Sequence, residues 1–541
     1  MRKRYRPVVL ALLDGLGVPQ NGSSTVFRAH RPNFELLEKY FPMATLQASG
    51  IAVGLPWGEE GNSEVGHITI GAGRPIFHYL PRIMLAIQDG SFFRNEAILE
   101  GINHVRKNNS RLHLLGLFSS GSVHSYAEHL YALLDLAKKE GIRKVYLHLF
   151  TDGRDASATE GAKFLEDLEF RIHENYPFAK IASISGRYFS MDRDEHWDRI
   201  ERVYNLLANG KGKQFKLASS YVSSEYAAGR TDEFVEPGFY ALDGSDIASG
   251  RIEKGDSVIF FNFREDSVRE LTRAFTEESF DKFPREKILD FVFVTMTEYE
   301  KGLPVRVAFT PLDISWPIAR VISEAGLKQL HIAETEKYAH VTYFFNGGYE
   351  KPFSGESRIL VQSLSGAHFD EHPEMSSREI TNDVLKKLGE YDFILFNLAN
   401  ADMVGHSGNF DATVRAIEVL DESIGRIFKA VLEIGGVMLV TGDHGNAEEK
   451  LYMVTGEKKT KHSINPVPLY LVAEDFRGTR ARSNEEIVEL YNKSSGILTD
   501  IAPTILELMG LPKPAEMTGV SLLPKLVGKI VPRARKWYDI F

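Results

Sequence analysis

The chain of 541 residues contains no cysteine. This absence excludes disulfide bonds and thiolate metal sites, so any metal ion must be bound by carboxylate, imidazole or hydroxyl groups. A chain without disulfides fits a reducing compartment. We therefore expect the protein to be cytoplasmic.

Long apolar segments are also missing. No segment approaches the roughly 20 apolar residues that a membrane-spanning helix requires, so no membrane partner is expected. The basic residues near the N-terminus precede only a short apolar run, Val8–Leu13, which Asp14-Gly15 interrupts. No small-residue cleavage site follows, and this pattern argues against a signal peptide.

Positive charge is not in excess, since the formal net charge is −10. The chain therefore has no overall attraction for nucleic acid, and no nucleic-acid partner is expected. Hydrophobic residues make up 43% and charged residues 26%, which is typical of a globular enzyme without low-complexity bias. We expect a small-molecule substrate and a monomer.

The length predicts two large units, because a single hydrophobic core stops growing at about 250–300 residues. Short β-rich apolar runs alternate with amphipathic helices, as in Lys144–Phe150 after the helix expected around Ala127–Lys139. This alternation predicts an α/β fold with a largely parallel sheet.

Three apolar runs each lead into residues that can bind metals, at opposite ends of the chain. They are Val8–Leu13 before Asp14, Phe393–Leu398 before Asp402, and Gly436–Thr441 before Asp443-His444. Functional groups of open α/β sheets collect at the carboxyl ends of strands, so these runs should share one sheet. We then expect a discontinuous domain of residues 1–78 and 307–515, an inserted domain of residues 79–306, and a C-terminal tail of residues 516–541. Two hinge strands are expected near Phe77–Arg82 and Gly302–Arg306.

The candidate metal ligands are carboxylates and imidazoles. Asp402 and His406 are four residues apart, which places them on one face of a helical turn. The other candidates are Asp14, Asp443, His444 and His462. This set suits Mn²⁺, Zn²⁺ or Mg²⁺, and two such ions about 3.5–4 Å apart would clamp an in-line phosphoryl transfer. Taken singly, each residue could instead be a helix cap or a solvated group.

Ser63 is the candidate nucleophile. It lies in the glycine-flanked string Gly61–His67, where a tight loop would let its hydroxyl approach a metal ion that stabilises the alkoxide. The same string also fits a helix that begins with an N-cap serine and carries Glu64 in its first turn.

Nine strings along the chain carry a family resemblance. They are Asp14-Gly15-Leu16-Gly17, Gly61–His67, Gly121-Ser122-Val123-His124-Ser125, Asp152-Gly153-Arg154-Asp155, Ser185-Gly186-Arg187-Tyr188, Met191-Asp192-Arg193-Asp194, Glu334-Thr335-Glu336-Lys337-Tyr338-Ala339-His340, Ala401-Asp402-Met403-Val404-Gly405-His406 and Asp443-His444-Gly445-Asn446. In this order they closely resemble the cofactor-independent (bisphosphoglycerate-independent) phosphoglycerate mutases of the alkaline phosphatase superfamily, over nearly the whole chain.

The resemblance implies an alkaline-phosphatase-like domain formed by both chain ends, with an inserted α/β domain that binds substrate. It implies two divalent metal ions, preferably Mn²⁺, and no bisphosphoglycerate cofactor. One ion would be bound by Asp402, His406 and His462, and the other by Asp14, Ser63, Asp443 and His444.

The resemblance also implies a set of substrate-binding residues. They are His124, Arg154, Asp155, Arg187, Arg193, Arg264 and Lys337. Guanidinium groups pair bidentately with carboxylate and phosphate, and phosphoglycerate carries both. Without the resemblance, each arginine could equally form a surface or interdomain ion pair, and Lys337 could be a lysine that snorkels from the edge of the core.

The implied reaction converts 3-phosphoglycerate into 2-phosphoglycerate. Ser63 takes the phosphoryl group, the glycerate reorients while bound, and its other hydroxyl takes the group back. Asp155 would move the proton on the glycerate hydroxyls, and Lys337 would neutralise phosphoryl charge. The alternatives are a related metal-dependent phosphatase or phosphomutase with another substrate, and a two-domain binding protein without chemistry.

One departure from the family pattern concerns substrate binding. The family usually shows Arg-Pro-Asp-Arg where this chain has Arg264-Glu265-Asp266-Ser267, so one expected arginine is missing. We expect weaker substrate binding, which Arg269 could offset only if the loop is rearranged.

Overall fold

The protein is described here by a computed structural model that covers residues 5–527 except residues 21, 23, 242–247, 365–367 and 453–454. The chain divides into two compact units. The first consists of Met1–His78 and Leu312–Phe541, and the second of Tyr79–Pro311. The part of the expected C-terminal tail from residue 528 onward lies outside the described residues.

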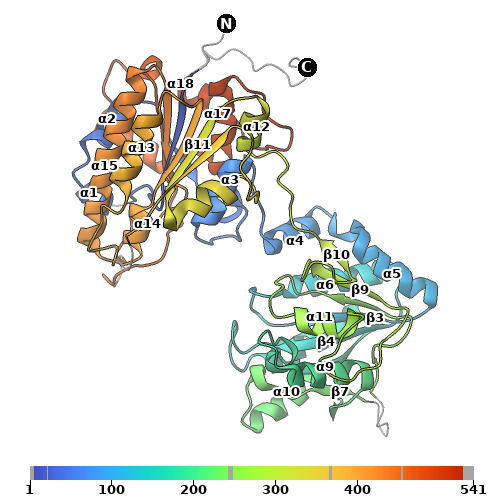
Figure 1. Cartoon of the computed structure of the whole chain (residues 1–541). Helices are drawn as coiled ribbons and strands as arrows, with labels where there is room; N and C mark the ends of the chain where they lie inside the picture. Colours follow the sequence, from blue (N-terminus) through green and yellow to red (C-terminus); the bar gives the residue numbers. More distant parts are fainter. Residues whose placement is uncertain are drawn as a thin grey trace. The chain divides into compact units, whose positions relative to one another are not determined.

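The first unit is built on an eight-stranded sheet, visible between its helices in Figure 1. In spatial order its strands are β12 (Glu356–Val361), β11 (Gln329–Glu334), β13 (Phe393–Leu398), β1 (Val8–Leu13), β14 (Val437–Thr441), β15 (Val467–Val472), β2 (Met43–Gln47) and β16 (Ser494–Ile497). The strands from β12 to β14 are parallel to one another, whereas β15 is antiparallel to both of its neighbours.

Helices cover both faces of this sheet. Its helical elements are α1 (Thr25–Arg28), α2 (Pro32–Tyr40), η1 (Gly50–Val53), α3 (Ser63–Ala72), α12 (Ile318–Glu324), η4 (Thr335–Lys337), η5 (His340–Phe344), α13 (Ser377–Lys387), α14 (Asn400–Gly405), α15 (Phe410–Glu433), η6 (Glu474–Phe476), α16 (Asn484–Asn492), η7 (Leu498–Asp500), α17 (Ile501–Met509) and α18 (Leu523–Val527).

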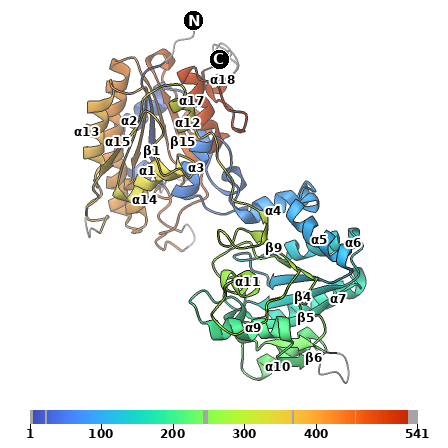
Figure 2. The same ribbon diagram turned by 45° about the vertical axis from the view of Figure 1, so that its right-hand side comes forward.

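The alternation of side chains along β1 shows how the two cores form. Val9, Ala11 and Leu13 pack in the core shared with α2, α13 and α15. Val8, Leu10 and Leu12 pack in the opposite core, shared with α3, α12 and α17. Figure 2 shows these two helix groups on opposite sides of the strands. A strand buried on both faces has no polar face, which explains the uninterrupted apolar sequence of β1.

The second unit has its own eight-stranded sheet. Its strands, in spatial order, are β10 (Arg306–Phe309), β9 (Val292–Thr297), β8 (Ser257–Phe260), β3 (Leu112–Leu117), β4 (Val145–Thr151), β5 (Ala179–Gly186), β7 (Gly238–Tyr240) and β6 (Lys213–Phe215). The strands from β10 to β5 are parallel, and β7 is antiparallel to β5. The predicted α/β class with largely parallel sheets is confirmed in both units.

The helices of the second unit also form two layers. They are α4 (Tyr79–Gln88), η2 (Phe92–Arg94), α5 (Glu96–Asn108), α6 (Ala127–Lys139), α7 (Gly161–Asn175), α8 (Arg187–Ser190), α9 (Trp197–Asn209), α10 (Ala218–Ala227), η3 (Asp232–Phe234) and α11 (Arg269–Thr276). Helices α5, α6 and α7 share one core, while α9 and α11 share the core on the other face.

The expected hinge strand at Phe77–Arg82 is wrong, because α4 begins at Tyr79. Leu80, Ile83 and Ile87 recur at helical spacing and pack against the same core. Pro81 lies in the first turn of this helix, where a proline removes no intrahelical hydrogen bond. At the other expected hinge, strand β10 begins at Arg306.

Among the described residues, no helix is both long and apolar enough to cross a membrane.

Candidate active site

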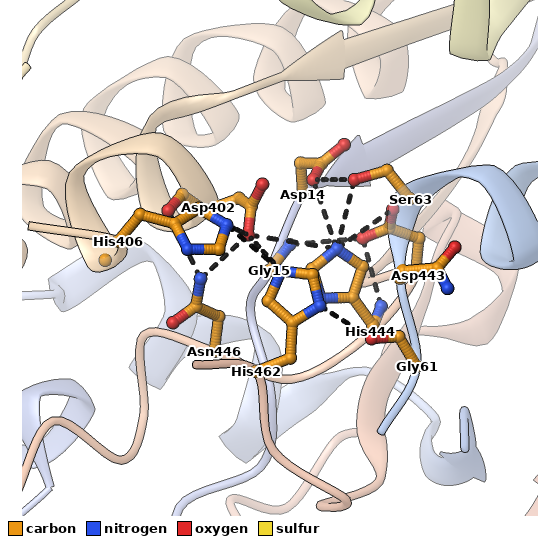
Figure 3. A network of polar contacts seen from close by, with 12 residues as sticks. Asp14, Gly15, Gly61, Ser63, Asp402, His406, Asp443, His444, Asn446 and His462 are labelled. Atoms are coloured by element: carbon orange, nitrogen blue, oxygen red, sulfur yellow. Dashed lines mark hydrogen bonds and ion pairs between the residues drawn. The ribbon is translucent and has the colours of Figure 1, made fainter. Parts of the chain in front are cut away.

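The candidate ligands of the first unit meet at one edge of its sheet. Asp14 follows β1, Asp443 and His444 follow β14, and Asp402 lies in α14, just after β13. These three strands are adjacent and parallel, so their carboxyl ends lie side by side. Because β15 runs in the opposite direction, the segment that leads into it brings His462 to the same edge. Figure 3 shows the resulting cluster.

One group consists of Asp402, His406 and His462. Asp402 Oδ1 lies 3.3 Å from His406 Nε2 and 3.2 Å from His462 Nε2. The Nδ1 atoms of the two histidines lie 2.9 Å from the carbonyl oxygen of Thr460 and 2.7 Å from that of Gly61. A carbonyl oxygen only accepts, so each Nδ1 carries a hydrogen, and in the neutral imidazole each Nε2 then presents a lone pair.

These lone pairs converge on the same place. The two Nε2 atoms lie 3.1 Å apart, and both face the Asp402 carboxylate. With both imidazoles neutral, three electron-pair donors would face one another, and this arrangement fits a bound cation. Backbone carbonyls that hold the remote nitrogen of a histidine are a usual second layer of metal sites.

The second group consists of Asp14, Asp443 and His444, all fully buried. His444 Nε2 lies 3.4 Å from Asp14 Oδ1 and 3.7 Å from Asp443 Oδ2. Asp443 Oδ1 accepts hydrogen bonds from the backbone N–H groups of Gly15 and His444, at 3.1 and 3.0 Å. Asp443 Oδ2 accepts none from the described residues, although His67 Nδ1 lies 3.2 Å away.

An unsatisfied buried carboxylate oxygen is costly in an apolar interior, so Asp443 Oδ2 is placed as a ligand for a cation. Gly15 allows the two groups to approach one another. Its φ is +72°, in the left-handed region, and a Cβ atom there would lie 2.7 Å from the Cα atom of Asp402. Both groups therefore fit a divalent metal ion, and their oxygen and imidazole donors suit such ions.

Ser63 lies between the two groups. It is the first residue of α3, and the N-cap is Asn62, whose side chain accepts from the N–H of Val65 at 2.9 Å. The hydroxyl of Ser63 is thus not used as a helix cap. It donates to Asp14 Oδ1 at 2.9 Å and lies 3.1 Å from His444 Nε2. A helix N-terminus also favours a negative group, such as a phosphate, at this position.

Lys337 reaches the same point from η4. Its Nζ atom lies 2.7 Å from each of three oxygens, which belong to Asp14, Ser63 and Asp402. Burial alone would lower the pKa of Lys337, but the carboxylates of Asp14 and Asp402 raise it well above its ordinary value. The side chain is buried and charged, so it is not a lysine that snorkels to solvent.

The electrostatics of the cluster favour cations. Burial alone would raise the pKa values of Asp14 and Asp402, but Lys337 and the neighbouring histidines lower both, so the two carboxylates are ionised. Burial would lower the pKa of His444, but Asp443 and Asp14 raise it to about 10. In the absence of metal, a proton on His444 thus supplies part of the positive charge that three carboxylates attract.

Two residues that contact this cluster received no role in the sequence analysis. Asn397 Nδ2 donates to Asp14 Oδ2 at 2.7 Å and lies 3.1 Å from His67 Nε2. His67 Nδ1 in turn donates to the carbonyl oxygen of Ser63 at 2.8 Å. A signal was present for Asn397, since it is the one polar residue in the apolar run Phe393–Leu398. His67 belongs to the string that contains Ser63, but nothing in that string indicates its contacts.

In the second unit, several expected substrate residues lie together at the carboxyl ends of β3, β4 and β5. Arg187 Nη1 donates to Asp155 Oδ2 at 2.6 Å, and its Nη2 lies 3.0 Å from His124 Nε2. Burial, followed by the charge of Arg187, lowers the pKa of His124 to about 4. His124 is therefore neutral and can accept this hydrogen bond.

Asp266 joins two further arginines to this network. Its Oδ2 atom lies 2.9 Å from both Arg193 Nη1 and Arg264 Nη2, and its Oδ1 atom lies 3.6 Å from His124 Nδ1. The structure thus brings together five of the expected substrate residues of this unit, with Asp266 as a counter-ion. Arg154 differs, because its guanidinium group binds Glu233, with Nε donating at 2.6 Å.

Arg269 does not take the place of the missing arginine. Its Nε atom donates to the carbonyl oxygen of Tyr299 at 2.8 Å, and its Nη2 atom lies 3.6 Å from Glu265. Ser267 is buried, and its hydroxyl donates to Asp266 Oδ1 at 3.0 Å. The departure from the family pattern is therefore not compensated by Arg269 in this arrangement.

Comparison with known proteins identifies the family. Residues 83–301 match the family model described as the N-terminus of bisphosphoglycerate-independent phosphoglycerate mutase. The chain is 47% identical to a 2,3-bisphosphoglycerate-independent phosphoglycerate mutase of Moorella thermoacetica, over 96% of this chain and 99% of the relative. A protein of the same name from Clostridium botulinum gives the same values.

A solved structure is similar over most of the chain. It is that of the Leishmania mexicana phosphoglycerate mutase at low cobalt concentration, with 30% sequence identity and a TM-score of 0.52. The match covers 95% of this chain and 97% of that one. The chain therefore belongs to the family of 2,3-bisphosphoglycerate-independent phosphoglycerate mutases.

Proposed function

We propose that this protein interconverts 3-phosphoglycerate and 2-phosphoglycerate through a phosphorylated Ser63, without bisphosphoglycerate. The observation that carries the proposal is the position of Ser63 Oγ, which lies 2.7 Å from Lys337 Nζ and 2.9 Å from Asp14 Oδ1, between two groups that fit metal ions. The names of the relatives support the same reaction.

The metal ions are proposed to be two Mn²⁺. Asp402, His406 and His462 would bind one, and Asp14, Ser63, Asp443 and His444 the other. When bound, they would lower the pKa of the Ser63 hydroxyl and neutralise charge on the transferred phosphoryl group. The mixed oxygen and imidazole donors fit Mn²⁺, as they also fit Zn²⁺ or Mg²⁺, and the preference for Mn²⁺ comes from the family resemblance.

The chain's own residues would carry out the transfer. Ser63 Oγ, deprotonated with its proton lost to solvent, attacks the phosphorus of 3-phosphoglycerate, the bond from phosphorus to the glycerate oxygen breaks, and protonated Asp155 gives its proton to that oxygen. After the glycerate reorients, Asp155 removes a proton from the other hydroxyl, whose oxygen then attacks phosphoserine and frees Ser63 in its deprotonated form. Lys337 stabilises the charge on the serine and phosphoryl oxygens throughout.

The two units are proposed to have different roles in the reaction. The unit formed from both chain ends is proposed to be the metal and nucleophile domain, and the inserted unit to bind the glycerate. The proposed binding residues of the inserted unit are His124, Arg154, Asp155, Arg187, Arg193 and Arg264, together with Lys337 from the first unit. Guanidinium groups suit the carboxylate of the substrate.

We also propose a cytoplasmic monomer, and the lack of cysteine supports this compartment.

The direct test is a mutase assay on the purified, Mn²⁺-loaded protein. We expect 2-phosphoglycerate to form from 3-phosphoglycerate with no added bisphosphoglycerate, because the phosphoryl group is recycled within one bound substrate. Activity that appeared only after bisphosphoglycerate was added would contradict the proposal. Release of inorganic phosphate as the main product would indicate the related phosphatase instead.

The replacement of an expected arginine by Ser267 favours one second candidate, a phosphomutase of this family with a changed substrate. If 3-phosphoglycerate is the substrate, Ser267→Arg should lower its KM by about ten- to hundredfold. A guanidinium group that binds a buried anion contributes about 1.5–3 kcal/mol. Steady-state kinetics on both proteins measures the difference.

Ser267→Ala is the matched control, because it removes the hydroxyl without adding charge. A thermal melt of each variant is needed, since Ser267 is buried beside Asp266 and a longer side chain must be accommodated there. If the wild type does not turn over 3-phosphoglycerate but consumes another phosphorylated compound, the second candidate is correct.

A further inference from the structure

Glu448 is a buried carboxylate next to the metal groups that has no role in the proposed reaction. Only 2% of the residue is exposed. Its Oε2 atom accepts hydrogen bonds from the backbone N–H groups of Gly17 and Asn446, at 3.0 and 2.9 Å. Its Oε1 atom accepts from Asn465 Nδ2 at 2.9 Å and from the hydroxyl of Ser463. Both oxygens are thus fully used.

The four donors belong to three segments, each of which carries a proposed ligand. Gly17 follows Asp14, Asn446 follows His444, and Ser463 and Asn465 follow His462. These segments are distant in sequence and lead from or into three different strands, β1, β14 and β15. A single carboxylate therefore fixes the relative positions of ligands from both metal groups.

The fourth ligand segment is joined through the neighbours of Glu448. Asn446 Nδ2 donates to Asp402 Oδ1 at 2.8 Å. Asn446 therefore binds Glu448 through its backbone N–H and orients Asp402 through its side chain. Lys450, also buried, donates from Nζ to the carbonyl oxygen of Gly405 at 3.0 Å and to the side chain of Asn446. The loop from Asn446 to Lys450, which continues the His444 segment, thus binds the segments of the three other ligands, Asp14, Asp402 and His462.

The surroundings of Glu448 are specific to a carboxylate. Within the described part of the chain, no arginine or lysine forms a salt bridge with it, so its direct hydrogen-bond partners are four neutral donors, with the charge of Lys450 nearby. Hydrogen bonds to an ionised group are stronger than those between neutral groups. Space is also reserved for it, since a Cβ atom on Gly17 would lie 2.4 Å from its Cδ atom.

We propose that Glu448 is a positioning residue that presets both metal groups before any ion binds. Without metal, Lys337 bridges Asp14 and Asp402, but one ammonium group does not balance the three carboxylates of Asp14, Asp402 and Asp443, and the remaining repulsion favours separation of their loops unless they are held. A site that is held in its binding geometry loses less free energy on ordering when the ion enters. This inference rests on the proposed two-metal function.

The test is Glu448→Gln, which keeps the shape but replaces one acceptor oxygen by an NH₂ group that faces two donors. We expect Mn²⁺ binding, measured by calorimetric titration of the metal-free protein, to weaken by about ten- to hundredfold for both ions, as for other second-layer substitutions. At saturating Mn²⁺, kcat should return close to the wild-type value and the KM for phosphoglycerate should be unchanged. In the metal-free variant, the amides of Gly17 and Asn446 should exchange hydrogen faster.

Glu449→Gln is the matched control. It makes the same substitution one residue along, where the carboxylate binds Lys459 at 2.9 Å and, among the described residues, accepts none of the four hydrogen bonds that Glu448 receives. We expect wild-type Mn²⁺ affinity for this variant, which separates the effect of position from that of lost charge.

Asn465→Ala gives an independent reading if Glu448→Gln does not fold. It removes one of the two links from Glu448 Oε1 to the His462 segment and leaves the one from Ser463, so the Mn²⁺ site that contains His462 should weaken and the other site should not. Wild-type affinity at both sites in the folded variants would overturn the inference while leaving the proposed function intact. If the wild type itself binds no Mn²⁺ and has no mutase activity, the proposed function fails instead.

Discussion

Replacing Ser63 by alanine is expected to lower phosphoglycerate interconversion to about one-thousandth of the wild-type rate or less. The substitution removes the only atom proposed to carry the phosphoryl group between the two hydroxyls, so no partial route remains. A coupled assay that consumes 2-phosphoglycerate, run at saturating Mn²⁺, measures the loss.

The fold of this variant and most of its metal binding should be retained. Ser63 is one of several proposed ligands, and α3 keeps its N-cap because that cap is Asn62. Circular dichroism and a Mn²⁺ titration therefore serve as controls. Wild-type-like turnover in Ser63→Ala would end the phosphoserine proposal, whereas lost turnover together with lost folding would require the test to be repeated with Ser63→Gly, which also lacks the hydroxyl.

Exhaustive chelation should inactivate the enzyme reversibly, and Mn²⁺ should restore it. In the metal-free cluster, the charges of Lys337 and His444 do not balance the three buried carboxylates. Activity should fall in acid, because His406, His444 and His462 must be neutral to bind metal. Activity measured before chelation, after it and after Mn²⁺ is added back checks this expectation.

The same experiment has a readout in stability. A ligand that binds only the folded state stabilises it by about 2.7 kcal/mol at one hundred times its dissociation constant. The Tm should therefore fall on chelation and recover with Mn²⁺, in parallel with activity. Full activity after exhaustive chelation would contradict the two-metal account.

The sequence predicted the architecture of the site because its ligands are tied to strand ends. Asp14 follows a strand with no polar residue, and Asp443 follows one whose single polar residue is its last, Thr441, and such runs are recognisable without a structure. Parallel strands of one sheet then bring distant residues to one edge. The two clusters formed by the six Asp and His candidates follow from this rule.

Other features could not be predicted, since they depend on contacts between segments far apart in the chain. From the sequence alone, Glu448 would be taken for an ordinary surface residue, because its contacts with Gly17 and Ser463 appear only in the folded chain. The helix at Tyr79 was mistaken for a hinge strand, because a short apolar segment with a proline fits either element until its packing is known. The contact of Arg154, a proposed substrate residue, with Glu233 is a further contact between distant segments.

The central claim is that the phosphoryl group passes through Ser63, and rapid-quench trapping tests it most directly. The Mn²⁺-loaded protein is mixed with 3-phosphoglycerate that carries a radioactive phosphate, quenched at a series of times, and digested for mass spectrometry. We predict label on the peptide that contains Ser63 as well as in 2-phosphoglycerate, and none on the protein in Ser63→Ala. Formation of labelled 2-phosphoglycerate with no label on Ser63 at any quench time would contradict the account.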